Sequence, residues 1–268
     1  MYNFPMPFHQ PDHIAYLTFE SFANSPIRHA IFTRRGGISA PPWAELNVGS
    51  TVGDDQNNVN ENRRRSFETV GRIADSMFDS WLVHDTQVLI ADHPAPPSIE
   101  RPRKADIILT DKPDVTLFMR YADCVPILLH DPNRGVVGLV HAGWKGTVKR
   151  VAKVAVEAMA TIYGSVLQDI QAAIGPSIGP HHYEVGQEVV SQAQDAFGAD
   201  ASEFFQKYNS STHFDLWTAN QAILSQAGLH QIENPEICTA CHLDDWFSHR
   251  AENGRTGRFG ALIGLNPA

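Results

Sequence analysis

The chain has 268 residues, of which 43% are hydrophobic and 19% charged, and its formal net charge is −9. This composition is typical of a globular protein with a substantial core, and the acidic balance argues against nonspecific nucleic-acid binding. Three cysteines do not make a disulfide framework, and the first residues resemble neither a signal peptide nor a membrane span. We therefore expect a reducing, cytoplasmic setting, with neither nucleic-acid nor membrane partners.

The beginning of the chain is predicted to form strands that lead into a loop. Ile14–Phe22 and Arg28–Thr33 have the apolar pattern of strands. They are followed by the basic turn Thr33–Gly37 and a stretch rich in glycine, asparagine and aspartate, which we expect to be a loop. Loops held between strands often carry sites, so Arg34 and Arg35 are candidates for binding phosphate or carboxylate, although exposed arginines are more often simply solvated.

A polar helix is predicted next, over Asn57–Gly71, with its apolar residues on one face. Trp81–Val88 is expected to be a strand that contains His84, where an isolated histidine is more often part of the core than a ligand. The proline-rich segment Asp92–Lys104 is interpreted as a surface loop inside one domain, because strands are expected to resume at Ala105–Thr110 and then at residues 115–120.

The centre of the chain predicts a β-hairpin. Two apolar runs, Val125–His130 and Val136–Val140, flank Asp131–Gly135, which has the proline, asparagine and glycine of a tight reversal. If the runs pair, Cys124 and His141 meet at the open end of the hairpin, with Cβ atoms about 5 Å apart if they are directly opposed. A cysteine and a histidine so placed indicate either metal ligands or a nucleophile and its base.

The hairpin leads into a glycine-containing loop and an amphipathic helix. The helix is expected to begin near Thr147, as its cap, and to reach Gly164, with a buried face at helical spacing (Val148, Val151, Ala155, Met159 and Ile162). A strand, a loop carrying Lys145 and a helix start together suggest an anion cradle. The alternative is that the glycines serve only a tight turn.

The last third predicts a strand at Asp169–Ile174 and two amphipathic helices, the second capped by Asp215 and ended by Gly228. The tail is expected to form a further hairpin of Trp246–Arg250 and Arg258–Ile263. Strands thus occur both in hairpins and between helices. This mixture favours an α+β fold, a layered sandwich with mixed sheets, in which residues 1–268 form a single domain.

A Cys-x-x-Cys-His pattern occurs at Cys238, Cys241 and His242. It is typical of c-type haem attachment, and half a zinc ribbon or a redox dithiol are further alternatives. The chain shows no export signal, no second Cys-x-x-Cys and no thioredoxin-like context. We therefore interpret the pattern as an incidental pair at the end of a strand.

Cys124 and His141, with His84 as a third ligand, form a stronger candidate site than the Cys-x-x-Cys-His pattern. One cysteine and two histidines make a three-ligand zinc site with an open fourth position, which is the catalytic type. The same His₂Cys set also suits copper. The metal-free alternative is a Cys124 thiolate with His141 as its base and Asp123 or another group as the orienting residue.

Motifs along almost the whole chain resemble the laccase-domain family, long labelled multicopper polyphenol oxidase. They follow the family's order, and the central pair Ala122–Pro126 and His141–Gly146 is highly specific. The other matching segments are Phe32–Gly37, Leu46–Gly49, Val52–Asp55, Glu61–Arg63, Val83–His84, Gly175–Pro176, Cys238–Thr239, Phe247–Arg250 and Thr256–Arg258.

The resemblance implies a metal site of His84, Cys124 and His141, usually zinc, and a substrate and phosphate pocket that involves Arg34, Asn47 and Arg250. Lys145 is a further candidate for phosphate. The implied activities are phosphorolysis of adenosine, inosine and methylthioadenosine, together with adenosine deamination. The implied fold is a layered sandwich shared with a bacterial deamidating toxin that uses a Cys–His pair, so a Cys–His hydrolase is an alternative.

The chain departs from the family pattern around the first ligand. Leu82 and Asp85 flank His84 where the family usually has Gln-x-His-Gly, and Tyr121 and His249 replace a threonine and a tyrosine. A true laccase is disfavoured, because the thirteen histidines are scattered and His181–His182 lacks His-x-His companions. The partners expected are small molecules, a purine nucleoside and phosphate, and no feature identifies a protein partner.

Overall fold

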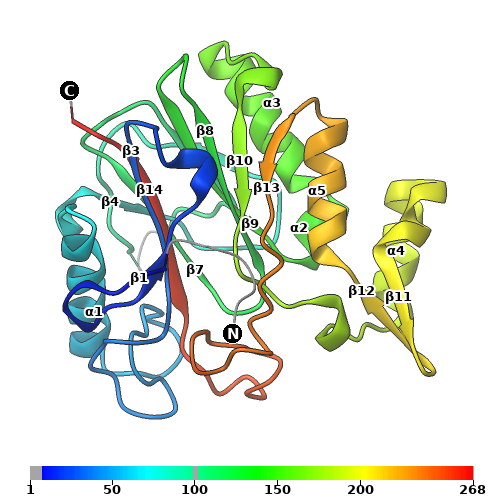
Figure 1. Cartoon of the computed structure of the whole chain (residues 1–268), viewed down its shortest axis with the longest axis horizontal. Helices are drawn as coiled ribbons and strands as arrows, with labels where there is room; N and C mark the ends of the chain where they lie inside the picture. Colours follow the sequence, from blue (N-terminus) through cyan, green and yellow to red (C-terminus); the bar gives the residue numbers. More distant parts are fainter. Residues whose placement is uncertain (1–7, 99–101, 268) are drawn as a thin grey trace.

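A computed structural model describes residues 8–98 and 102–267 and shows two mixed β-sheets between layers of helices (Figure 1). Each sheet has six strands among the described residues. Within the same residues no helix is long and apolar enough to cross a membrane. The fold is therefore the mixed, layered α/β arrangement that the alternation of hairpins and helices predicts.

The first sheet contains both ends of the described chain. Its strands lie in the order β1, β2, β3, β14, β7 and β4, with bounds Phe8–His9, Tyr16–Leu17, Ile27–Phe32, Phe259–Leu265, Thr116–Tyr121 and Met77–Asp79. Only the β4–β7 pair is parallel. The central strand β14 thus pairs with β3 on one side and with β7 on the other.

The second sheet is built around the central hairpin. Its strands lie in the order β13, β10, β8, β9, β6 and β5, with bounds Gln231–Glu233, Gln171–Ile174, Val125–Asp131, Val136–Ala142, Ile107–Thr110 and Val88–Ile90. The outermost pair at each edge is parallel and the inner pairs are antiparallel. A separate hairpin joins β11 and β12, Phe205–Tyr208 and Ser211–Phe214.

The described residues form five α-helices, which lie outside the two sheets. Their bounds are α1 Gln56–Thr69, α2 Trp144–Val148, α3 Val151–Tyr163, α4 Gln187–Phe197 and α5 Leu216–Gln226. Helix α1 packs on the first sheet, and α3 and α5 pack on the second (Figure 1). Short 3-10 helices connect these elements, among them η5 at Pro180–His182.

Alternate residues of β8 and β9 face two different cores. Ile127 and Leu129 pack against the helices, whereas Leu128 packs against the first sheet. In β9, Val140 faces the helices and Leu139 faces the first sheet. A strand buried on both sides has no polar face, which explains the near-continuous apolar runs of this hairpin.

Three local predictions are confirmed. Helix α1 spans nearly the whole predicted segment and buries Val59 and Phe67. Helix α5 is capped by Asp215, whose side chain accepts a hydrogen bond from the backbone N–H of Thr218, and the chain turns at Gly228 with φ +102°. The central hairpin has the predicted turn, and each of its strands extends slightly beyond its predicted end.

Four local predictions are wrong. Residues 14–22 contain only the two-residue strand β2 and a 3-10 turn, and Trp81–Val88 is largely irregular. Residues 246–250 form a loop whose first three residues are buried, so the tail contributes one strand, β14, and no hairpin. The helix expected to begin at Thr147 is two helices, α2 and α3, because Arg150 interrupts it with φ +58°.

The buried histidine of β3 predicts a loss of stability at acidic pH. His29 Nε2 accepts a hydrogen bond from the backbone N–H of Phe19 at 2.8 Å, and burial, with His130 and His9 nearby, lowers its pKa to about 4. Below pH 6.5 the unfolded chain binds a proton there that the folded chain does not. Between pH 7.5 and pH 5 this linkage destabilises the fold by about 2 kcal/mol.

Urea unfolding of the wild type and of His29→Gln at these two pH values measures the effect, since glutamine keeps an acceptor but does not titrate. The pH-dependent loss is expected to be about 2 kcal/mol smaller in the variant. Equal losses in the two proteins would contradict this assignment.

Candidate active site

Three metal-ligating side chains from separate segments converge at the open end of the central hairpin. Cys124 directly precedes β8, His141 lies near the end of β9, and His84 comes from the irregular segment before β5. Their donor atoms all lie within 4.8 Å of one another. In the hairpin His141 lies opposite Pro126. Cys124, two residues before Pro126, is therefore a diagonal neighbour of His141 rather than its direct partner.

A buried carboxylate that the sequence analysis did not single out holds two of these segments. Asp106 lies just before β6, and its Oδ1 is 2.8 Å from His141 Nδ1. Its Oδ2 accepts the backbone N–H groups of Val83, at 3.1 Å, and Asp85, at 2.9 Å. The carboxylate thus fixes the His141 ring and the backbone on both sides of His84. A carboxylate on the far nitrogen of a ligating histidine is the usual support of such ligands.

His84 itself has φ +59°, a conformation rare for residues other than glycine. The two hydrogen bonds to Asp106 that flank it hold the backbone in this shape. An aspartate at position 85, where the family usually has glycine, is therefore tolerated, because the residue with positive φ is His84. Asp85 instead pairs with Lys149 at 2.9 Å. Leu82 packs against the core between the sheets and also lines the cavity next to the site.

The glycine that follows β9 is required by the site. A Cβ atom on Gly143 would lie 2.9 Å from Cys124 Sγ and 3.1 Å from His84 Cδ2. Any larger residue would push these two side chains apart. The glycine-containing loop therefore makes room for the donor cluster. Lys145, the candidate anion ligand of this loop, is exposed and lies over the Trp144 ring.

The cysteine and the buried histidine polarise each other. Burial raises the pKa of Cys124, but the charges and hydrogen bonds of His141 and His84 outweigh it and lower the pKa to about 6. Burial lowers the pKa of His141, but Cys124 and Asp106 outweigh it and raise the pKa to about 9. Between these values the metal-free pair is a thiolate beside an imidazolium.

Asp123, one of the orienting groups considered for the metal-free alternative, does not contact the His141 ring. Its backbone has φ +84° and its carboxylate faces the other way, accepting from Thr239 Oγ1 at 2.7 Å and from the backbone N–H of Arg250 at 2.6 Å. Asp106 is the orienting group. Asp123 instead ties two later segments of the chain to the residue beside Cys124.

The three donors lie in the wall of a cavity of about 520 Å³. This volume is within the usual range for small-molecule sites, about 300 to 1,000 Å³. Tyr121 and His249, the two substituted positions of the family pattern, both line it. The Tyr121 hydroxyl donates to the carbonyl of Val140 at 3.0 Å, so its ring rather than its hydroxyl is presented to the site.

Four arginines line the cavity and make part of its wall cationic: Arg103, Arg120, Arg250 and Arg258. Arg120 pairs with Asp79 and donates to the carbonyl of Ser80 at 2.7 Å. Arg250 donates to the carbonyl of Glu184 and lies over the Tyr183 ring, 5.0 Å from its centroid. Of these arginines, only Arg250 was expected from the sequence.

Arg34, Asn47 and Lys145 are not among the residues that line this cavity. Arg34 donates to the carbonyls of Ala44 and Leu243 and pairs with Glu252 at 3.1 Å.

Asn47 is fully buried, and its Oδ1 accepts the backbone N–H groups of Gly49 and Arg258, both of which line the cavity. Asn47 therefore positions the cavity wall without contacting the cavity.

The donor set fits a catalytic metal ion. Two histidines and one cysteine leave a fourth position for substrate in a tetrahedral site. The carboxylate on His141 Nδ1 leaves Nε2 for the ion, and Gly143 leaves the space that His84 and Cys124 need. These features suit zinc, and the same His₂Cys set also accepts copper.

Comparisons with known proteins find relatives along most of the chain. The chain is 39% identical over 242 residues to a purine nucleoside phosphorylase of Deinococcus radiodurans, covering 90% of each chain. It is 36% identical to purine nucleoside phosphorylase YlmD of Geobacillus stearothermophilus, covering 87% of this chain and 88% of that one.

Solved structures show the same architecture. The crystal structure of YlmD from Geobacillus stearothermophilus superposes with a TM-score of 0.89 at 32% identity, covering 98% of this chain and all of that one (100%). The Bacillus licheniformis hypothetical protein YfiH gives a TM-score of 0.88 at 29% identity, covering 97% and 99%. The family model described as multi-copper polyphenol oxidoreductase laccase matches residues 28–266. The chain therefore belongs to the multi-copper polyphenol oxidoreductase laccase family.

Proposed function

We propose that this protein is a zinc-dependent purine nucleoside phosphorylase with an associated adenosine deaminase activity. The observation that carries the proposal is a His₂Cys donor group in the wall of a cavity that four arginines also line. A metal ion held by the donor group would act as a Lewis acid, and the arginines would bind phosphate, both within one cavity. The relatives named purine nucleoside phosphorylase support the same reading.

His84, Cys124 and His141 would hold the zinc ion, which supplies a Lewis acid for a substrate or phosphate oxygen and for hydrolytic removal of an exocyclic amine. Asp106 keeps His141 in the tautomer that presents Nε2 to the site. The positive φ of His84, held by the same carboxylate, aims the second imidazole at Cys124.

Phosphate binding is assigned to the cationic wall. In phosphorolysis the anionic nucleophile must lie in line with the glycosidic bond, and most of the catalysis comes from positioning and charge. Arg258 and Arg250 lie on the chain segments that Asn47 and Asp123 hold by their backbone N–H groups. We assign phosphate to these two guanidinium groups and give Arg34 and Asn47 positioning roles.

Asp79 is proposed to contact the nucleoside. It lines the cavity, and its Oδ1 is buried without a hydrogen-bond partner in the described part of the chain. Such an orphaned acceptor is unfavourable unless a ligand supplies a donor. A ribose hydroxyl is a suitable donor, and the Arg120 guanidinium pairs with the same carboxylate.

A Cys–His hydrolase is the second candidate. Without metal, Cys124, His141 and Asp106 have the order of a nucleophile, its base and the orienting acid, and the pKa of the thiol is lowered to about 6. A laccase is less well supported. Its trinuclear cluster needs many histidines together, whereas among the described residues only two groups have metal-ligand spacing, and each contains two histidines.

The principal prediction concerns the reaction itself. Zinc-loaded protein is expected to convert adenosine to adenine only when phosphate is present, and to inosine at a rate independent of phosphate. Chromatography of the products with and without phosphate measures both. Cys124→Ala is expected to abolish both activities, and loss of only one would contradict a shared site. If zinc is bound and neither product forms, the proposed function is wrong.

The assignment of phosphate to Arg258 rather than Arg34 is tested by two matched variants. Arg258→Gln is expected to lower kcat/KM for phosphate about 10- to 100-fold, because a charge-assisted hydrogen bond contributes about 1.5 to 3 kcal/mol. Arg34→Gln, which removes the same charge outside the cavity, is expected to change this ratio less than about threefold and to lower the melting temperature instead. If Arg34→Gln lowers kcat/KM for phosphate and Arg258→Gln does not, the phosphate site contains Arg34 instead.

Alkylation distinguishes the metal enzyme from the Cys–His hydrolase. In metal-stripped protein the Cys124 thiolate forms as pH rises through about 6, so iodoacetamide modification, located by peptide mapping, is expected to level off near pH 7. An ordinary thiol would continue to accelerate up to about pH 9. Added zinc is expected to block the reaction and restore nucleoside turnover. Alkylation that zinc leaves unchanged would favour the hydrolase.

A further inference from the structure

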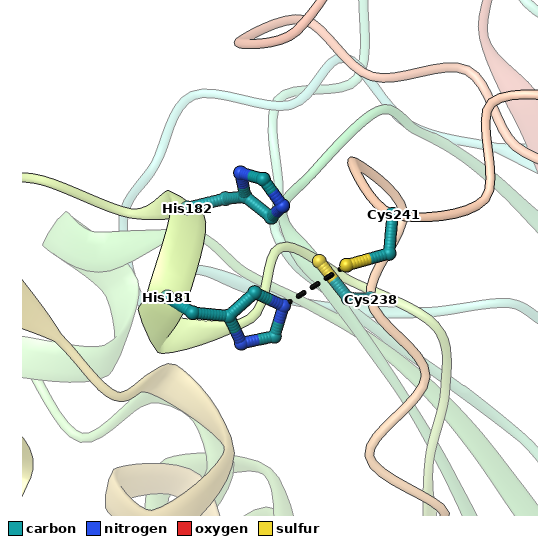
Figure 2. A group of neighbouring side chains, drawn as sticks. All are labelled: His181, His182, Cys238 and Cys241. Carbon is teal, nitrogen blue, oxygen red and sulfur yellow. Dashed lines mark hydrogen bonds between the residues drawn. The ribbon is translucent and has the colours of Figure 1, made fainter.

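A second donor cluster lies apart from the cavity and is formed by His181, His182, Cys238 and Cys241 (Figure 2). Both histidines lie on the 3-10 helix η5, and both cysteines lie on the loop that follows β13. None of the four lines the cavity of the proposed active site. We propose that these four residues form a structural zinc site of the closed Cys₂His₂ type.

The geometry of the donors supports this assignment. Their ligand atoms all lie within 4.8 Å of one another, and His181 Nε2 is 3.1 Å from Cys241 Sγ. In a tetrahedral zinc site, with metal–ligand bonds of about 2.0 to 2.3 Å, neighbouring donors are separated by about 3.3 to 3.8 Å. Small side-chain movements therefore close the cluster around one ion. In Figure 2 the two imidazoles extend from one segment towards the two thiols of the other.

The backbone brings the two ligand pairs together. Ser177 and Cys238 form a parallel bridge, in which the N–H of Thr239 donates to the carbonyl of Ser177 at 3.0 Å. The N–H of Gly179 donates to Cys238 Sγ at 3.2 Å. Donation from a backbone amide to sulfur is the support expected for a metal-bound thiolate. The site is thus held by two paired segments that lie far apart in the sequence.

The exposed His181 ring has close neighbours on one side. A Cβ atom on Gly179 would lie 2.6 Å from both His181 Cε1 and the Trp217 ring, so only glycine fits between them. Trp217 is held in turn by its Nε1, which donates to Ser177 Oγ at 2.7 Å. Because the His181 ring already lies against Gly179 and Trp217, less side-chain entropy is lost when an ion binds.

Four protein ligands leave no open position, so the proposed role is structural rather than catalytic. The ion would link η5 to the Cys238–Cys241 loop. The Arg250 guanidinium lies over the ring of Tyr183, which directly follows η5. Thr239, from the Cys238–Cys241 loop, donates to Asp123 beside Cys124. The second site would therefore stabilise one wall of the cavity.

Zinc content by elemental analysis tests the proposal on the full chain, purified in reductant without added metal and with any affinity tag removed. The background is Cys124→Ala, which removes the proposed catalytic ion. This variant is expected to hold one zinc per chain, and Cys124→Ala with Cys241→Ala to hold none. Cys124→Ala with His242→Ala, which alters the histidine next to the cluster, is expected to keep its zinc. If Cys124→Ala holds no zinc, or if removal of Cys241 does not lower the content, the proposal is overturned.

Two further readouts do not depend on activity. Cobalt bound to Cys124→Ala is expected to show thiolate-to-metal charge transfer and the intense visible bands of tetrahedral coordination, and to lose them in the Cys241→Ala double variant. A chelator is expected to lower the melting temperature of Cys124→Ala by about 5 °C, as for an ion at about 100 times its Kd, but not that of the double variant. A Cys238–Cys241 disulfide in the freshly purified protein, with no cobalt spectrum, would overturn the site. Failure of nucleoside turnover leaves these results unaffected.

Discussion

One buried carboxylate determines whether the donor cluster exists. Asp106 has no solvent exposure and accepts from His141 Nδ1 and from two backbone N–H groups beside His84. Its own carbonyl also accepts the backbone N–H of His141 at 2.8 Å. Burial raises the pKa of this carboxyl, but its hydrogen bonds to the histidine and the backbone outweigh that effect and lower the pKa. The charge is thus retained where it fixes one ligand through its ring and another through its backbone. Without it, the left-handed conformation of His84 would have no local support.

The parts of the fold that were predictable are those with a local cause. The turn residues of the central hairpin and the Asp215 cap each act within a few residues, and the structure contains both as expected. The errors occur where tertiary packing overrides local pattern. The aromatic residues Trp246 and Phe247 have the pattern of a strand, but they lie in a loop whose packing against the first sheet buries them. The interruption at Arg150 has no counterpart in the apolar periodicity, which runs through it unchanged.

The residues of the site also divide into those placed by a local pattern and those placed by tertiary packing. Cys124 and His141 are brought together by a hairpin that the sequence predicts, whereas His84 was added because a metal site needs a third ligand, and the family resemblance supported it. Asp106 and Arg258 come from other strands and loops, so no spacing in the sequence connects them to the cysteine. A weak signal for Asp106 was present, since an acidic residue at the start of an apolar strand needs a buried partner. For the second cluster the signal was divided between an adjacent histidine pair and a Cys-x-x-Cys far downstream. Neither half is specific alone.

The two donor clusters are joined through the residue that precedes Cys124. Asp123 accepts Thr239 Oγ1, from the loop of the second cluster, and the backbone N–H of Arg250, from the cationic wall. Its φ of +84° is the strained conformation that lets one carboxylate reach both. Hydrogen bonds through Asp123 therefore connect the Cys238–Cys241 loop to Arg250 and to the start of β8. This connection helps to set the position of Arg250 relative to Cys124, because it fixes the Arg250 backbone, whereas the Glu184 carbonyl and the Tyr183 ring hold the guanidinium.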